Sequence, residues 1–173
     1  MRSPNIQKSN NLTIKQKAKK IKLVLTDNDG VLTDTGVFYS SKGEELKRFS
    51  IRDGMGVERL RDIASIETGI ITGEFSGIVN KRADKLKITE VYLGIKEKHL
   101  LLPDILKKSN LKAENIAFIG DDMNDLELLK LVGLTASPAD GFPVIRKMVD
   151  YVCKKKGGNG AFREFAELIL KYR

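Results

Sequence analysis

Residues 23–30 have the sequence Leu23-Val24-Leu25-Thr26-Asp27-Asn28-Asp29-Gly30, an apolar run that leads into an acidic turn. Its first four residues are apolar or β-branched, which predicts a buried strand, and the glycine marks a turn. Two aspartates follow that strand, one residue apart. Because crowded carboxylates repel one another, such a pair needs a nearby cation, and Mg²⁺ prefers oxygen ligands of this kind. The stretch therefore predicts a metal site at a strand end.

A second stretch repeats this design. In Asn115-Ile116-Ala117-Phe118-Ile119-Gly120-Asp121-Asp122-Met123-Asn124-Asp125, an apolar strand again runs into a glycine and a cluster of acids. In a parallel sheet, ligands bind at the carboxyl ends of the strands. Two strand ends of this kind could share one metal ion.

The rest of the chain alternates between strand and helix patterns, which favours an α/β fold with a mostly parallel sheet flanked by helices. A small β-hairpin is expected over about residues 37–49. The expected strands lie near 21–26, 67–73, 91–93, 116–119, 134–136 and 151–153. Helices are expected from Asp53 through Ile63, over 78–86, 100–106, 126–129 and 162–170, with Asp53 as a cap and Pro103 near a first turn.

Charge and composition indicate one domain with a basic arm. Seven of the 31 basic residues lie in residues 1–22, which contain no acid, so the other 24 nearly balance the 23 acids. We expect residues 1–20 to be a flexible tail and 21–173 to form the domain. The sequence favours no nucleic-acid or membrane partner and shows no leader or spanning segment. With Cys153 as the single cysteine, a cytoplasmic setting is expected.

Four short motifs occur in order along the chain. They are Asp27-Asn28-Asp29-Gly30, Thr72-Gly73, Lys98 and Gly120-Asp121-Asp122-Met123-Asn124-Asp125. Together they resemble the motifs of the haloacid-dehalogenase-like (HAD) phosphohydrolases, over about residues 21–173. The resemblance implies a Rossmann-like fold and phosphoryl transfer.

The same resemblance implies catalytic roles for four residues. Asp27 would be the nucleophile that forms an aspartyl-phosphate, and Asp29 would be the general acid and base. Thr72 and Lys98 would hold the phosphoryl oxygens. Each feature also has an ordinary alternative, because Asp-Gly is a common turn and a lone lysine often lies on a solvated helix face.

The metal implied by the resemblance is Mg²⁺. Its ligands would be the Asp27 carboxylate, the Asp29 main-chain carbonyl and Asp121. Asp122 and Asp125 would orient metal-bound waters or neighbouring groups. The alternative for Asp122 is a helix cap.

The spacing of the motifs leaves no room for a folded cap domain. Only 42 residues separate Asp29 from Thr72, and 25 separate Thr72 from Lys98. With the segments 49–56 and 157–164, this resembles the capless phosphatases of 2-keto-3-deoxy sugar acids. That family forms homotetramers in which the hairpin of one subunit helps to close the site of a neighbour, and its C-terminal Gly-rich segment approaches the site.

Two features indicate different substrates. Arg52-Asp53-Gly54 is similar to the phosphatases of 3-deoxy-D-manno-octulosonate (KDO) 8-phosphate, whereas Thr72-Gly73-Glu74 with Arg82 and Lys85 resembles the enzymes for nine-carbon, sialic-acid-type 9-phosphates. We expect KDO 8-phosphate, with N-acylneuraminate or KDN 9-phosphate as the alternative. An alternative of another class is a non-catalytic oligomerisation domain linked to a sugar-acid cytidylyltransferase. The expected substrate-binding residues are Arg52, Thr72, Gly73, Glu74, Arg82, Lys85 and Lys98.

Overall fold

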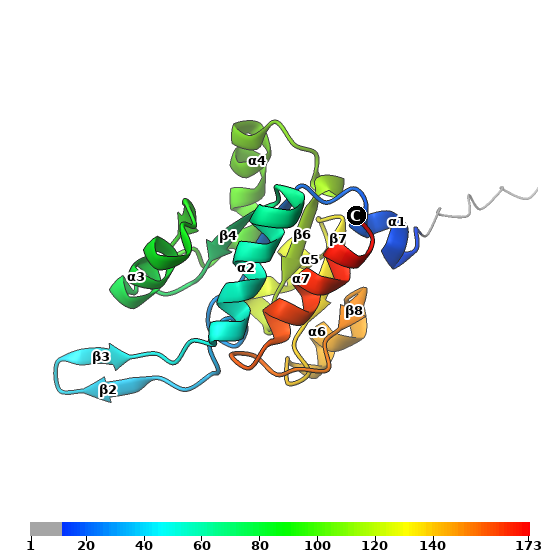
Figure 1. The fold of residues 1–173 in the computed structure, drawn as a ribbon. Coiled ribbons are helices and arrows are strands. Elements are labelled where there is room, and N and C mark those ends of the chain that lie inside the picture. The colour runs from blue at the N-terminus through cyan, green and yellow to red at the C-terminus, as the bar shows by residue number, and fades with distance from the viewer. Residues whose placement is uncertain (1–11) are drawn as a thin grey trace, which may run out of the picture.

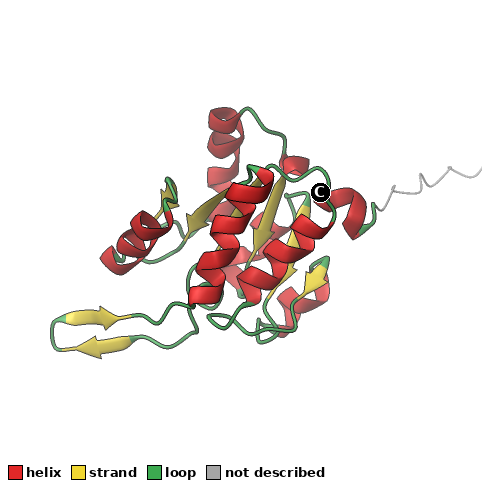
Figure 2. Cartoon of the chain, in the orientation of Figure 1, coloured by secondary structure: helices red, strands yellow, loops and turns green. Residues whose placement is uncertain are grey.

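The computed structural model describes residues 12–173, and a six-stranded sheet runs through its centre (Figures 1 and 2). The strands lie in the order β5-β4-β1-β6-β7-β8, and every neighbouring pair is parallel. Their bounds are β1 Leu23–Thr26, β4 Glu67–Ile71, β5 Glu90–Tyr92, β6 Ile116–Ile119, β7 Leu134–Ser137 and β8 Tyr151–Val152. The α/β fold with a parallel sheet is confirmed.

The helices cover both faces of this sheet. Their bounds are α1 Ile14–Ala18, α2 Ile51–Ala64, α3 Gly77–Leu86, α4 Lys98–Ser109, α5 Leu126–Leu129, α6 Pro143–Met148 and α7 Ala161–Lys171, with short 3₁₀ turns η1 Ala113–Asn115 and η2 Met123–Asp125. Buried residues of α1, α2, α3 and α7 share one core cluster, and those of α4, α5 and α6 share the other. Figure 1 shows α2 and α7 side by side in front of the sheet.

The strand sequences explain the two cores. Successive side chains of a strand point to opposite faces. In β1, Leu23 and Leu25 pack in the core under α4, whereas Val24 packs in the core under α2 and α7. In β6, Phe118 packs in the core under α4, and Ile119 packs in the core under α2 and α7. Apart from Thr26, these strands are therefore apolar along their length, as is typical of strands buried on both faces.

The predicted hairpin forms a separate antiparallel pair, β2 Phe38–Ser40 and β3 Gly43–Leu46. It projects from the body of the molecule (Figure 1). Its apolar side chains are exposed, with Phe38 at 63%, Tyr39 at 70% and Leu46 at 64% of full exposure. Between β1 and β4 the chain forms this hairpin and helix α2, and no folded cap domain lies there.

Two helix starts differ from the expectation. Ser50, not Asp53, caps α2, because its side chain accepts hydrogen bonds from the amides of Arg52 and Asp53. Pro103 lies inside α4 rather than in its first turn, because that helix already begins at Lys98.

The flexible tail expected over residues 1–20 is wrong for its last part. Thr13 caps helix α1, Ala18 is buried, and Lys17 pairs with Asp150 at 2.5 Å. Buried apolar contacts and a capped helix hold this part against the body. The rest of the predicted tail, residues 1–11, lies outside the described residues. None of the helices in residues 12–173 combines the length and apolar character needed to cross a membrane.

Candidate active site

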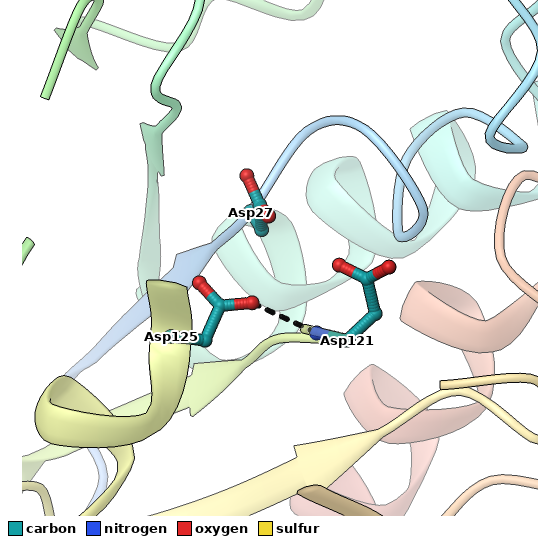
Figure 3. Close-up of side chains that lie close together, drawn as sticks. All are labelled: Asp27, Asp121 and Asp125. Carbon is teal, nitrogen blue, oxygen red and sulfur yellow. Dashed lines mark hydrogen bonds between the residues drawn. The ribbon is translucent and has the colours of Figure 1, made fainter. Parts of the chain in front are cut away.

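The two acidic stretches meet because β1 and β6 are neighbours in the sheet. Thr26 pairs with Ile119, and the Asp27 amide donates to the Ile119 carbonyl at 3.0 Å. One carboxylate oxygen from each of Asp27, Asp121 and Asp125 lies within 4.8 Å of the others (Figure 3). The expected convergence of the two strand ends is confirmed in the structure.

A buried lysine lies against this cluster. Lys98 has no exposed surface, and its Nζ lies 2.9 Å from Asp27 Oδ1 and 2.6 Å from Asp125 Oδ1. Burial by itself would lower the pKa of Lys98, but the two carboxylates outweigh burial and raise the pKa. Lys98 is therefore a fixed positive charge beside Asp27, and the alternative of a solvated helix residue is wrong.

Both carboxylate oxygens of Asp125 already have hydrogen-bond partners in the protein. Its Oδ1 binds Lys98, and its Oδ2 accepts the amides of Asp121 at 2.8 Å and Asp122 at 3.3 Å. Gly120 permits this close approach, since a Cβ at that position would lie 2.5 Å from the Asp125 carboxyl group. Asp125 thus positions Lys98 and the acidic loop, although it belongs to the carboxylate cluster.

Four buried side-chain oxygens have no partner within the described part of the chain, and two of them, Asp121 Oδ1 and Asp29 Oδ2, belong to the acids of this site. Buried polar atoms in proteins are nearly always hydrogen-bonded, so these atoms indicate a missing ligand or substrate. Asp121 also packs against the loop after β1, because a Cβ on Gly30 would lie 2.0 Å from Asp121 Oδ2. These residues fit a divalent metal held between the two loops.

The pKa values in the cluster reflect crowding of negative charge. Burial, followed by repulsion from Asp125, raises the pKa of Asp27 to about 7, although Lys98 acts in the opposite direction. Burial, followed by repulsion from Asp27 and Asp125, raises the pKa of Asp121 to about 8. A bound dication would remove the repulsion, which is the electrostatic reason for a metal here.

Asp29 has one occupied and one free oxygen. Lys47 donates to Asp29 Oδ1 at 2.5 Å, Asn28 Nδ2 donates to it at 3.2 Å, and the Thr33 hydroxyl lies 3.3 Å away. The Lys47 side chain is 1% exposed. Sequence reasoning missed Lys47, because only folding brings the residue after β3 to the loop after β1.

A cavity of about 450 Å³ opens beside these groups. Its lining includes the predicted residues Asp27, Asp29, Thr72, Gly73, Glu74 and Asp121, with Thr35, Asp122, Met123 and Asn124. Thr72 is almost fully buried at the end of β4, and its Oγ1 accepts the Glu74 amide at 3.2 Å. Asp122 caps the turn that follows it, as the alternative for that residue had it.

Four predicted substrate-binding residues do not line this cavity, and one of them is Lys98, which is fully buried in the carboxylate cluster. Arg52 lines a different cavity, and Lys85 is exposed on α3. Arg82 donates to the Ser50 carbonyl at 3.0 Å and stacks on the Phe49 ring at 5.5 Å. Within one chain, Arg82 therefore links α3 to the start of α2.

The Gly-rich segment reaches the site as the resemblance implies. The Gly158 amide donates to the Val31 carbonyl at 2.8 Å, and a Cβ on Gly157 would lie 1.8 Å from the Gly30 carbonyl oxygen. Asp53 anchors the segment to α2 by accepting a hydrogen bond from the Gly160 amide at 3.0 Å. Glycine is required here because the two backbones are in contact.

Comparison with known proteins agrees with this geometry. A family model described as haloacid dehalogenase-like hydrolase matches residues 60–165. The chain therefore belongs to the haloacid dehalogenase-like hydrolases.

Individual relatives within these hydrolases indicate a narrower family. The 3-deoxy-D-manno-octulosonate 8-phosphate phosphatase KdsC of Escherichia coli K12 is 40% identical over 89% of this chain and 81% of its own length. The enzyme of that name from Haemophilus influenzae is 39% identical, covering 91% and 87%. A Moraxella catarrhalis 3-deoxy-D-manno-octulosonate 8-phosphate phosphatase, solved with magnesium, phosphate and KDO, has a TM-score of 0.89 and 41% identity over 92% and 91%. Within the hydrolases, the chain belongs to the 3-deoxy-D-manno-octulosonate 8-phosphate phosphatase family.

Proposed function

We propose that this protein is a Mg²⁺-dependent phosphatase that converts KDO 8-phosphate into KDO and phosphate. The observation that carries the proposal is the buried Asp27–Lys98–Asp125 cluster at the edge of a cavity, in a chain 40% identical to KdsC. A non-catalytic oligomerisation domain has no need for a buried lysine paired with two carboxylates, which are costly to desolvate.

In the first chemical step, the Asp27 carboxylate attacks phosphorus and the bond from phosphorus to the sugar oxygen breaks. Asp29 donates its proton to the departing oxygen, so that an alcohol leaves instead of an alkoxide. An aspartyl-phosphate remains on Asp27. Lys98 supports this step by holding the nucleophile in place and supplying positive charge.

In the second step, Asp29 removes a proton from water, and the resulting oxygen attacks the phosphorus of the aspartyl-phosphate. The bond from phosphorus to Asp27 breaks, which releases phosphate and restores the carboxylate. Thr72, buried at the end of β4 and lining the cavity, is placed to bind a phosphoryl oxygen. Asp29 thus acts as a general acid in the first step and as a general base in the second.

Mg²⁺ would be held by the Asp27 carboxylate, the Asp29 main-chain carbonyl and Asp121. When bound, the metal supplies positive charge that offsets the negative charge of the carboxylates and the phosphoryl group. The unpartnered Asp121 Oδ1 supports this ligand set.

The test is a comparison of kcat/KM for KDO 8-phosphate and N-acetylneuraminate 9-phosphate with Mg²⁺ present. We expect KDO 8-phosphate to be preferred at least about tenfold, which corresponds to about 1.4 kcal/mol in transition-state binding. A preference for the nine-carbon substrate would overturn the assignment of substrate but not of reaction. Failure to hydrolyse either ester would overturn both.

We also propose a homotetramer in which the hairpin covers the site of a neighbouring subunit. The exposed Phe38, Tyr39 and Leu46 support it, because an apolar surface of this kind favours protein contacts. Arg52 and Lys85, which lie outside the cavity, would contact substrate only in such an assembly. Light scattering at assay concentration tests this, and a fully active monomer would contradict it. The expected cytoplasmic location stays a prediction.

A further inference from the structure

One buried ion pair is not needed by the reaction as described above. Lys47 directly follows β3, at the base of the projecting hairpin, yet its side chain is 1% exposed. Its Nζ lies 2.5 Å from Asp29 Oδ1 and 3.2 Å from Glu44 Oε2. A lysine normally keeps its ammonium group in water, so its burial here requires these two carboxylates.

The ion pair leaves the Asp29 carboxylate asymmetric. Three donors surround its Oδ1, namely Lys47, the Asn28 side chain and the Thr33 hydroxyl. Its Oδ2 is buried without a partner in residues 12–173, and Asp29 lines the cavity. A carboxylate with one oxygen held in this way has a single oxygen left for proton transfer, and it cannot rotate freely between the two.

The lysine is itself held from a second element. Glu44, on β3, accepts a hydrogen bond from the Ser76 hydroxyl at the start of α3. The chain of contacts therefore runs from α3 through the hairpin to Asp29. Movement of the hairpin would be transmitted to the carboxylate through the short Lys47 contact.

We propose that Lys47 is a positioning residue for the reaction, which fixes Asp29 through Oδ1 so that Oδ2 carries the transferred proton. Lys47 acts through Asp29 and couples the placement of the hairpin to acid catalysis. This inference rests on the proposed function, in which Asp29 protonates the departing sugar oxygen.

The test compares esters that differ in their need for an acid. A sugar alkoxide must be protonated as it leaves, whereas p-nitrophenolate leaves readily without a proton. For each ester, kcat/KM reports the steps up to formation of the aspartyl-phosphate. In Lys47→Met, kcat/KM for KDO 8-phosphate should fall about 30- to 100-fold, the range of a mispositioned general acid, whereas that for p-nitrophenyl phosphate should fall less than about threefold.

Three further variants complete the design. Lys47→Arg keeps a cation and should recover at least about a third of the lost activity. Glu44→Gln keeps Lys47 but removes the charge of its second partner. In this variant kcat/KM for KDO 8-phosphate should again fall more than kcat/KM for p-nitrophenyl phosphate, although by less than in Lys47→Met. Glu44→Gln therefore tests the proposal even where Lys47→Met folds poorly. Arg48→Met removes the exposed neighbouring ion pair with Asp34 and should behave as wild type.

Equal losses with both esters in Lys47→Met and Glu44→Gln would overturn the proposal, and so would no loss in either variant. A different result would contradict the proposed function. If the wild type does not hydrolyse KDO 8-phosphate, that assignment is wrong, and the ratio is then measured with a sugar phosphate that the wild type does hydrolyse.

Discussion

The loops that follow β1 and β6 both present carboxylates at the same edge of the sheet, but they use them differently. After β6, Asp125 has both oxygens bonded to Lys98 and to backbone amides. After β1, Asp29 has one oxygen held and one free. Asp121, beside Asp125 in the loop after β6, also keeps a buried oxygen without a partner in the described chain. The two loops therefore differ in which carboxylate oxygens are free, and in the proposed function these free oxygens belong to the acid catalyst and to a metal ligand.

The largest effect is expected at the nucleophile. Asp27→Asn should lower kcat by about 10⁴-fold or more, because an amide does not form the phosphorylated intermediate. The variant should retain its fold, since removing one charge from crowded carboxylates relieves repulsion. Phosphate release and circular dichroism measure the two properties. Turnover close to the wild-type rate would remove Asp27 from this role.

The supporting acid should instead be needed for stability. Asp125→Asn loses an anionic partner of the buried Lys98 and one of its two acceptor oxygens. We expect a loss of about 2–4 kcal/mol in the free energy of unfolding, measured by urea denaturation, besides a large loss of activity. The matched control is Asp122→Asn, whose side chain is exposed and caps a short turn. A loss of stability confined to the control would reverse our assignment of the two acids.

The neighbouring Asp121 should affect the metal more than the fold. Asp121→Asn should raise the Kd for Mg²⁺ by about 100-fold with little change in metal-free stability, because its free Oδ1 supports no internal bond. Titration calorimetry of wild type and variant measures this difference. Unchanged metal affinity would show that the free oxygen serves another purpose.

The smallest effect is a dependence of metal-free stability on pH. The folded-state pKa values of Asp27 and Asp121, about 7 and 8, lie above the ordinary value of 3.8, so the folded state binds more protons than the unfolded state between those limits. Stability should therefore fall as pH rises from 5.5 to 8. In chelator, we expect Tm to fall by about 4 °C or more over this range, with a smaller decrease in Mg²⁺. A metal-free Tm that rose with pH would contradict the assigned shifts.

Local sequence patterns were sufficient for most of the fold because its elements have distinct periodicities. The apolar runs of β1 and β6 predict strands buried on both faces, and each run ends where its glycine and acids begin. Helix starts were less predictable. Ser50 and Asp53 are both good caps, and only the packing of Asp53 against the Gly-rich segment removes it from the cap position.

Other features depend on contacts between distant segments. No local pattern marks Lys47 as buried, because its partner Asp29 stands in another loop. The sequence position of Arg82 is compatible with binding a ligand or with supporting the fold. Its hydrogen bond to the Ser50 carbonyl shows a role in the fold. The described contacts of α1 likewise place its residues against the body, where composition indicated a solvated arm.

Residue type and short-range periodicity are enough to predict strands β1 and β6, the acids that follow each strand and the chemistry of those side chains. Which oxygens are free, which acid supports Lys98 and where Lys47 lies depend on contacts that form only in the folded chain. The physical reason is that hydrogen-bond partners in this site come from segments far apart in the chain, and a carboxylate's role depends on the donors that folding places beside it.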